Sequence, residues 1–198
     1  MVFDELEAAR RESFTFKGAP VEAFVHDPGT LAWFVNDDAA RGRPSILSMI
    51  AESQTIGKDL ECAAALQHAV SASLRAGPPA LTQAELDALR YEITDAVDDL
   101  RGERTAPELL AIGAMLYSKL AELALRGRGR WSGAGKWTPR LLTKADHALG
   151  GRFDTAFRAL FEVGQPDPVI ALAESELAPH GGRLLEGDRR TAPAEWRA

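Results

Sequence analysis

Residues 11–26 read RESFTFKGAPVEAFVH, and they mark the point where the character of this sequence changes. Apolar and polar side chains alternate along the stretch, on either side of a break at residues 17–20 that contains glycine and proline. A period of two is typical of strands, and a short break of this kind between two such runs is typical of a hairpin. The stretch therefore predicts two short antiparallel strands, with Val21 and Val25 on one face and Glu22 on the other.

The rest of the chain has the period of helices. Two short helical segments follow the hairpin, one beginning near Thr30 and one carrying the apolar residues of 46–50. Thr82 is followed three residues later by Glu85, which is a capping box at the start of a longer helix. Apolar residues three and four apart predict helices over residues 60–76, 83–101, 107–126, 139–149, 154–163 and 168–177. The expected fold class is α+β, a small antiparallel sheet of about two to three strands followed by a bundle of about five helices.

The length of 198 residues suits one globular domain with a small appendage. We divide the chain into a strand-containing part, residues 1–55, and a helical part, residues 56–180. Residues 181–198 contain glycine, proline and arginine without apolar periodicity, and we expect a loosely ordered tail there.

Composition excludes several classes of protein. Apolar runs end far short of the roughly 20 residues that cross a bilayer, and the acidic N-terminus lacks the pattern of a signal peptide. Cys62 is the single cysteine, which excludes an internal disulfide framework, and its small apolar neighbours predict a buried helical position. A net charge of −6 argues against a general nucleic-acid binder. We expect a cytoplasmic protein with neither a membrane nor a nucleic acid as its partner.

Glu22 is the first candidate functional residue. It stands between apolar residues on a predicted strand, and burial of a carboxylate without a partner is unfavourable. Its side chain must therefore face either solvent or a cation. Exposure on the polar face of a half-buried strand is the simpler interpretation, and a metal ligand is the functional one.

Residues 123–145 form a basic stretch without a single acidic side chain. Its six cations are Arg126, Arg128, Arg130, Lys136, Arg140 and Lys144, and it also holds four glycines and two tryptophans. Glycines allow a ligand to approach the backbone closely, and a helix beginning near Trp137 would offer amide N–H groups to phosphate. The stretch predicts an anion site, with a solvated helix end as the alternative.

Acidic residues line one side of a predicted helix. Glu92, Asp95 and Asp99 are spaced by three and four, which places them on one face. Like charges side by side are unfavourable unless a cation answers them. A Mg²⁺ ion, a substrate amine or the neighbouring Arg90 and Arg101 could do so, and a solvated acidic face is the alternative.

Taken together, these segments resemble the nucleotidyltransferases of the DNA-polymerase-β-like superfamily. The closest likeness is to aminoglycoside-nucleotidyltransferase-like members with a C-terminal helical domain. The resemblance extends over nearly the whole chain. It rests on GAPVEAFVH (residues 18–26), GRP (42–44), GP (77–78), YEITDAVDDL (91–100) and GKWTPR (135–140).

The resemblance implies a function and a set of site residues. Members transfer a nucleotidyl group from a nucleoside triphosphate, which we expect to be ATP, to a hydroxyl of a small molecule, with Mg²⁺ held by three carboxylates. Residues 1–55 then correspond to part of the catalytic domain. By this match Glu22 is the third metal-binding carboxylate, Lys136, Arg140 and Arg130 contact the triphosphate, and Asp95 or Asp99 is the catalytic base.

The sequence departs from the family on its N-terminal side. The Gly-Ser motif and the Asp-x-Asp pair that supply the other two carboxylates are not in it, and residues 1–4 resemble the end of the strand that carries the pair. We therefore expect in-frame codons upstream of Met1 to encode these motifs. Two functions stay open, a nucleotidyltransferase completed by that strand and a catalytically inactive nucleotide- or partner-binding protein. In the second, another chain could pair with the open sheet edge, and a homodimer is one such arrangement.

Overall fold

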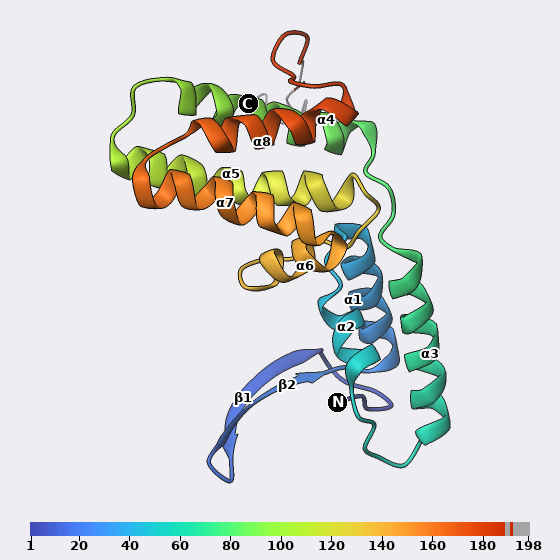
Figure 1. Ribbon diagram of the computed structural model, residues 1–198. Coiled ribbons are helices and arrows are strands. Elements are labelled where there is room, and N and C mark those ends of the chain that lie inside the picture. The colour runs from blue at the N-terminus through green and yellow to red at the C-terminus, as the bar shows by residue number, and fades with distance from the viewer. Residues whose placement is uncertain (189–190, 192–198) are drawn as a thin grey trace, which may run out of the picture. The chain divides into compact units, whose positions relative to one another are not determined.

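The computed structural model describes residues 1–188 and residue 191 (Figure 1). The chain divides into two compact units, residues 1–79 and residues 80–198, which we call unit 1 and unit 2. Within the described residues, one two-stranded antiparallel sheet is followed by eight α-helices and a short 3₁₀ helix. The predicted α+β class, a small sheet followed by a helical bundle, is confirmed.

The predicted hairpin is present in unit 1. Strands β1 (Arg10–Phe16) and β2 (Ala19–Val25) pair antiparallel along their whole length. Lys17 and Gly18 connect them with φ angles of 49° and 82°. Two consecutive residues with positive φ give a tight turn whose twist matches that of the flanking strands.

Three helices follow in unit 1, α1 (Pro28–Arg41), α2 (Ser45–Glu52) and α3 (Leu60–Ala76). α1 begins slightly before its predicted start, because Asp27 and Thr30 form a capping box that the sequence analysis missed. The Asp27 carboxylate accepts the Thr30 amide at 2.7 Å, and this hydrogen bond lowers the pKa of Asp27.

A buried carboxylate joins α1 to α2. Asp38 is fully buried, and its Oδ2 accepts the amide N–H groups of Ile46 and Leu47 in the first turn of α2. α2 has no side-chain cap of its own, so Asp38 satisfies amides that the helix leaves open. Arg41 donates to the other carboxylate oxygen at 3.1 Å. Burial nevertheless raises the pKa of Asp38, because the loss of hydration outweighs these hydrogen bonds.

α3 packs with α2 in unit 1. The side-chain amide of Gln67 donates to the carbonyl oxygens of Ile50 at 3.2 Å and Ser53 at 2.8 Å. These bonds tie the middle of α3 to the end of α2. The boundary between the units, at Pro79, consequently falls later than residue 55, where the sequence analysis divides the chain.

Cys62 is exposed, so its predicted burial is wrong. The fully buried position of α3 is Val70, and Leu66 and Leu74 flank it on the same face. Cys62 continues this row, four residues before Leu66, but it lies in the first turn of the helix, where it is exposed. Small apolar neighbours were therefore no guide to burial here.

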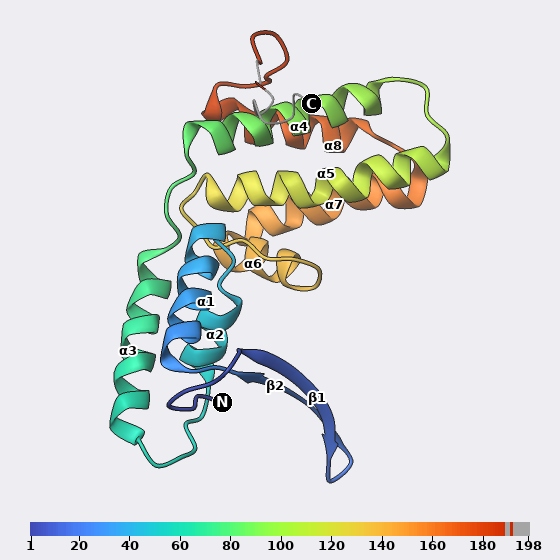
Figure 2. The same ribbon diagram turned by 180° about the vertical axis from the view of Figure 1, so that it is seen from behind.

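Within its described residues, unit 2 contains five α-helices and ends in the 3₁₀ helix η1. These elements are α4 (Gln83–Arg101), α5 (Ala106–Arg126), α6 (Trp137–Ala145), α7 (His147–Val163), α8 (Asp167–Leu177) and η1 (Ala178–His180). α4 and α8 form one layer of the unit, α5 and α7 form the next, and α6 packs beyond them (Figures 1 and 2). The main apolar core lies between these helices and includes Ile93, Leu120 and Phe153. None of the described helices is long and apolar enough to span a membrane.

Two capping boxes start the longest helices of unit 2. The predicted box at Thr82 and Glu85 is confirmed, and a second one at Thr105 and Glu108 begins α5. In each box the glutamate accepts the threonine hydroxyl at 2.7 Å. These hydrogen bonds lower the pKa of both glutamates.

One predicted helix, residues 139–149, is divided in the structure. Asp146 has extended backbone angles, φ −160° and ψ 121°, and separates α6 from α7. Its carboxylate accepts the Ala148 amide at 2.8 Å, so α7 begins well before its predicted start. A Cβ at Gly150 would lie 2.5 Å from the Thr143 hydroxyl oxygen, so glycine is needed where α7 passes α6.

Part of the predicted tail is held against α4. The Arg90 guanidinium donates to the Gly181 carbonyl oxygen at 3.0 Å, and the Leu184 amide donates to the Thr94 hydroxyl at 3.0 Å. These bonds anchor the backbone at residues 181–184, and the expected loose order of the tail stays a prediction. Residues 189–190 and 192–198 of the predicted tail lie outside the described residues.

Candidate functional site

The basic stretch forms a platform around Trp137, at the start of α6. Trp137 is 54% exposed. The Arg140 Cζ atom lies 5.1 Å from the centroid of its ring, and the Lys136 Nζ atom lies 5.9 Å from it. These are cation–π distances. An exposed flat ring with two cations beside it can bind an aromatic group and an anion together, and we call Lys136, Trp137 and Arg140 the Trp137 platform.

The loop between α5 and α6 folds back on α6 and positions the platform. The Thr138 hydroxyl donates to the Gly133 carbonyl oxygen at 3.2 Å. A Cβ at Gly133 would lie 2.8 Å from the Leu141 side chain and 3.1 Å from the Trp137 Cβ, so this close packing favours glycine. Gly135, just before the platform, has a φ of 54°, in the left-handed region that glycine adopts most easily.

The first amides of α6 do not face a ligand, so the predicted backbone site for phosphate is wrong. The Trp137 amide donates to the Ala134 carbonyl oxygen at 3.1 Å, and the Thr138 amide donates to that of Gly135 at 3.2 Å. Pro139 has no N–H. The turn into the helix takes up the amides that a phosphate would bind. The positive charge of the platform comes from its side chains.

Two of the six cations in the basic stretch serve the fold of unit 2. Arg126 is buried, and Arg128 donates to the Glu176 carboxylate at 2.6 Å. Glu176 is itself buried and also accepts Arg152 at 2.7 Å. A buried carboxylate needs such partners, so Arg128 neutralises Glu176. The other four cations of the stretch, Arg130, Lys136, Arg140 and Lys144, are exposed.

Two of the three side chains on the acidic face of α4 form ion pairs with cations of unit 2. Glu92 pairs with Lys119 of α5 at 2.6 Å, and Asp99 pairs with Arg104 at 2.8 Å. Asp95 is exposed. These ion pairs favour the interpretation of a solvated acidic face. The role of Asp95 or Asp99 as a catalytic base stays a prediction.

This acidic face and the Trp137 platform lie on different sides of unit 2. α4 packs against α5 and α8, whereas α6 packs against α5 and α7. Both views show α5 and α7 between α4 and α6 (Figures 1 and 2). The structure therefore does not bring Asp95 and Asp99 next to the predicted triphosphate ligands Lys136 and Arg140.

Glu22 lies in unit 1, on the exposed face of the hairpin. It stands opposite Ser13 of β1, while Ala23 and Val25 are buried on the other face, as the alternation predicts. Among residues 1–188 and 191, no three His, Cys, Asp or Glu side chains are grouped so that they could hold a metal ion. Mg²⁺ prefers octahedral oxygen coordination, and Glu22 alone supplies too few ligands for it.

The end of β2 is closed by the N-terminal residues. The Phe3 amide donates to the His26 carbonyl oxygen at 2.8 Å, and the His26 amide donates to that of Met1 at 2.9 Å. The His26 ring is buried edge-on against Phe34, with 5.0 Å between the centroids. This burial lowers the pKa of His26. We find a packing role for His26, which directly follows β2, the strand that carries Glu22.

Sequence reasoning missed a cavity between α5, α6 and α7. Tyr117, Phe157 and Arg158 are among the residues that line it. Each of them follows the ordinary helical period of its segment, and none belongs to a motif. The cavity could be found only from the packing of the three helices, which the sequence pattern does not show.

Comparison of the chain with protein-family models, with curated proteins and with solved structures found no match.

Proposed function

We propose that this chain is a nucleotidyltransferase-like protein whose unit 2 binds the nucleoside triphosphate at the Trp137 platform. The observation that carries the proposal is the exposed Trp137 ring with Lys136 and Arg140 beside it. A nucleotide has a flat base, and stacking on an aromatic side chain contributes about 1–3 kcal/mol per base. It also has a chain of phosphates, which lysine and arginine bind through charge-assisted hydrogen bonds. The platform offers both kinds of contact.

Arg130 adds a third cation to the proposed site. It is exposed on the loop that leads to α6. Its amide donates to the Leu125 carbonyl oxygen at 2.9 Å, which anchors its backbone at the end of α5. With Arg128 engaged by Glu176, Arg130 is the cation of this turn that is left for a phosphate.

The proposed reaction is the transfer of a nucleotidyl group to a hydroxyl of a small molecule. The hydroxyl oxygen attacks the α-phosphorus and its proton passes to water, a new P–O bond forms, and the bond from the α-phosphorus to the departing pyrophosphate breaks. Lys136, Arg140 and Arg130 would hold the β- and γ-phosphates and stabilise the charge of the departing pyrophosphate. Glu22 is the single carboxylate of the family's metal site that this sequence matches, so we assign no step to a metal ion.

A second candidate function is binding without catalysis, either of a nucleotide or of a partner. The observation that favours it is the isolation of Glu22, since the described residues hold no group of three potential metal ligands. In this case the platform still binds a nucleotide. Mg²⁺ would then act only by binding to ATP itself, so it should change the ATP affinity of the parent and of Glu22→Gln equally.

Isothermal titration of the purified chain with ATP tests the platform. Lys136→Ala should weaken ATP binding roughly ten- to a hundredfold, because a hydrogen bond to a charged group contributes about 1.5–3 kcal/mol. Lys144→Ala removes an exposed cation from the last turn of the same helix and is the matched control, which should bind ATP like the parent. The melting temperature without ATP should be the same for all three proteins. Undiminished ATP binding by Lys136→Ala would overturn the proposal.

Titration with and without Mg²⁺ separates the two functions. If Glu22 contributes to a metal site, Mg²⁺ should strengthen ATP binding by the parent and not by Glu22→Gln, which keeps the shape and removes the charge. If the chain only binds, Mg²⁺ should have the same small effect on both proteins.

A further inference from the structure

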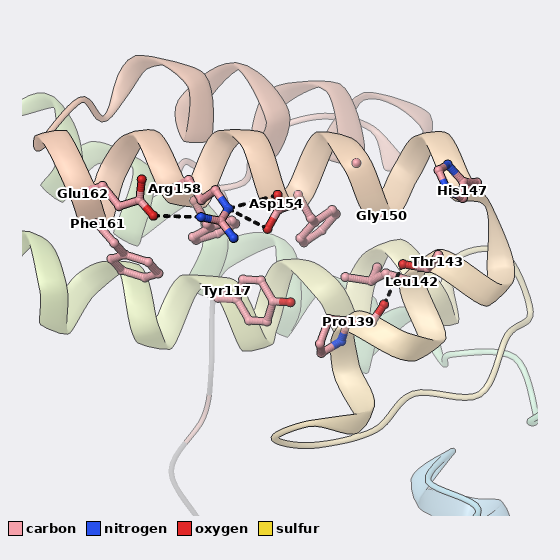
Figure 3. A pocket seen from close by; sticks show the side chains of 13 residues that line it. Tyr117, Pro139, Leu142, Thr143, His147, Gly150, Asp154, Arg158, Phe161 and Glu162 are labelled. Atoms are coloured by element: carbon pink, nitrogen blue, oxygen red, sulfur yellow. Dashed lines mark hydrogen bonds and ion pairs between the residues drawn. The ribbon is translucent and has the colours of Figure 1, made fainter.

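A cavity of about 550 Å³ lies within unit 2, between α5, α6 and α7 (Figure 3). α7 lines it from His147 to Glu162, with Leu142 of α6 and Tyr117 of α5 on the other sides. Sites for small molecules have volumes of about 300–1,000 Å³, so the size is suitable. Neither Trp137 nor Arg140 lines it, so it is separate from the Trp137 platform.

Aromatic side chains line the cavity. Tyr117 meets Phe157 edge to face with 4.8 Å between the centroids, and Phe157 stacks on Phe153 at 6.0 Å. Phe161 continues the row and is partly exposed, at 43%. The Tyr117 ring reaches from α5 into the space beside α7 (Figure 3). Phe153 and Phe157 are themselves buried, so a flat apolar body would pack against Tyr117 and Phe161, which they support.

Charged side chains of α7 form a rim along the cavity. Arg158 Nε donates to both carboxylate oxygens of Asp154 at 3.1 Å, and Arg158 Nη1 donates to Glu162 at 2.9 Å (Figure 3). Two carboxylates share one guanidinium, so this rim keeps a net negative charge. Burial raises the pKa of the Tyr117 hydroxyl, and the negative charge of Asp154 raises it further. The field of Asp154 therefore reaches the lining of the cavity.

Gly151 also lines the cavity, and close packing does not explain why this position is a glycine. It lies inside α7, where glycine is about 1 kcal/mol less favourable than alanine. A Cβ at Gly151 would meet no atom within 4 Å, whereas a Cβ at the neighbouring Gly150 would lie 2.5 Å from Thr143. Close packing thus accounts for Gly150 and not for Gly151. The absence of a side chain at 151 keeps volume open for an occupant.

We propose that this cavity binds an organic cation with a flat aromatic body. The aromatic lining suits the body, and the negative rim of Asp154 and Glu162 favours a cation over an anion. This inference rests on the cavity alone and is independent of the nucleotide proposal.

Isothermal titration of the full chain with three naphthalenes of the same shape tests the charge preference. These are 2-naphthamidine, a cation, 2-naphthamide, which is neutral, and 2-naphthoate, an anion. The amidine should bind about tenfold more tightly than the amide, and the naphthoate more weakly than both. Equal binding of amidine and amide, or no binding of the amidine, would overturn the proposal.

Gly151→Leu tests the place of binding, because leucine fills the cavity. It should weaken amidine binding about tenfold or more, while the melting temperature is not lowered, since the new Cβ meets no atom and helix propensity rises. Thr155→Leu, at an exposed position of α7 outside the lining, is the matched control and should bind like the parent. Lys136→Ala should also leave amidine binding unchanged, which separates this site from the Trp137 platform. If Gly151→Leu binds the amidine like the parent, the cavity is not the site.

Asp154→Asn is a second variant that does not depend on filling the cavity. Asp154 is 66% exposed, so the substitution should leave the fold intact. Without the charge of Asp154, the positive charge of Arg158 cancels the negative charge of Glu162, and the rim becomes neutral. The amidine should then bind no more tightly than the amide, with the affinity for the amide unchanged. A retained preference for the amidine would contradict the role of the rim.

Discussion

In unit 2 one apolar core connects all five α-helices of the described residues, whereas in unit 1 a buried carboxylate joins two helices. The cluster of buried apolar side chains runs from Ile93 to Leu177, and its members all belong to unit 2. Unit 1 leaves large apolar side chains such as Phe14, Phe16 and Trp33 exposed. Unit 2 therefore gains most of its stability from burial, while unit 1 buries fewer apolar side chains, among them Leu31, Leu47 and Val70, and depends more on particular hydrogen bonds. A two-stranded hairpin adds little stability of its own.

The largest effect should come from the core of unit 2. Phe153→Ala should lower the free energy of unfolding by about 3–5 kcal/mol, because the fully buried ring leaves a cavity between α5 and α7. Urea unfolding followed by circular dichroism measures it. Phe14→Ala, at an exposed position of unit 1, is the control and should change the free energy by no more than about 0.5 kcal/mol. Similar losses of free energy for the two variants would contradict the proposed difference between the two units.

Removal of the Asp38 carboxylate should have the next largest effect. Asp38→Ala leaves the amides of Ile46 and Leu47 without their acceptor, which costs about 1–3 kcal/mol. Amide hydrogen exchange should rise in α1 and α2 and stay unchanged in α4 to α8. Asp37→Ala, which removes only a surface ion pair with Arg41, should have a smaller effect. Faster exchange in all helices would show that the two units unfold together.

Substitution of Glu176 tests how much a buried charge contributes to the stability of unit 2. Glu176→Gln keeps the shape and removes the charge that Arg128 and Arg152 neutralise. We expect a loss of roughly 1–2 kcal/mol, because both arginines are partly exposed and water can solvate them again. Glu174→Gln, at an exposed position of the same helix, should have almost no effect in the same urea titration. A larger loss of free energy than that of Asp38→Ala would mean that unit 2 depends more on its buried carboxylate than unit 1 does.

The smallest effect is the pH dependence of the helix caps. The folded pKa values of Glu85 and Glu108 lie below the reference value of 4.5, so their contribution is complete above that pH and is lost as pH falls through the folded pKa. The pKa of Asp38 is raised, so its contribution has the opposite sign, present below 3.8 and lost as pH rises through the folded value.

Differential scanning calorimetry of Thr82→Ala measures this dependence. The substitution removes the partner of Glu85, so it should lower the melting temperature more at pH 7 than at pH 3. An equal shift at the two pH values would mean that the hydrogen bond to Glu85 does not contribute to stability.

Local features of the fold could be predicted because they depend on neighbouring residues. The hairpin follows from alternation around Lys17 and Gly18, and the capping box at Thr82 follows from the spacing to Glu85. The break at Asp146 could not, because apolar residues continue on both sides of it and the close passage of α7 by α6 is a tertiary contact.

The candidate site was predictable in composition and not in arrangement. The order of the residues is enough to show that residues 123–145 form a basic stretch with glycines and tryptophans, and that Glu22 lies on the polar face of its strand. The pairing of Arg128 with Glu176, and the position of Lys136 and Arg140 beside an exposed Trp137, follow from the folded structure. The physical reason is that partners of a charge are found through space, across helices that lie far apart in the sequence. The cavity lined by Tyr117, Asp154 and Gly151 has the same origin, since it exists only where three helices meet.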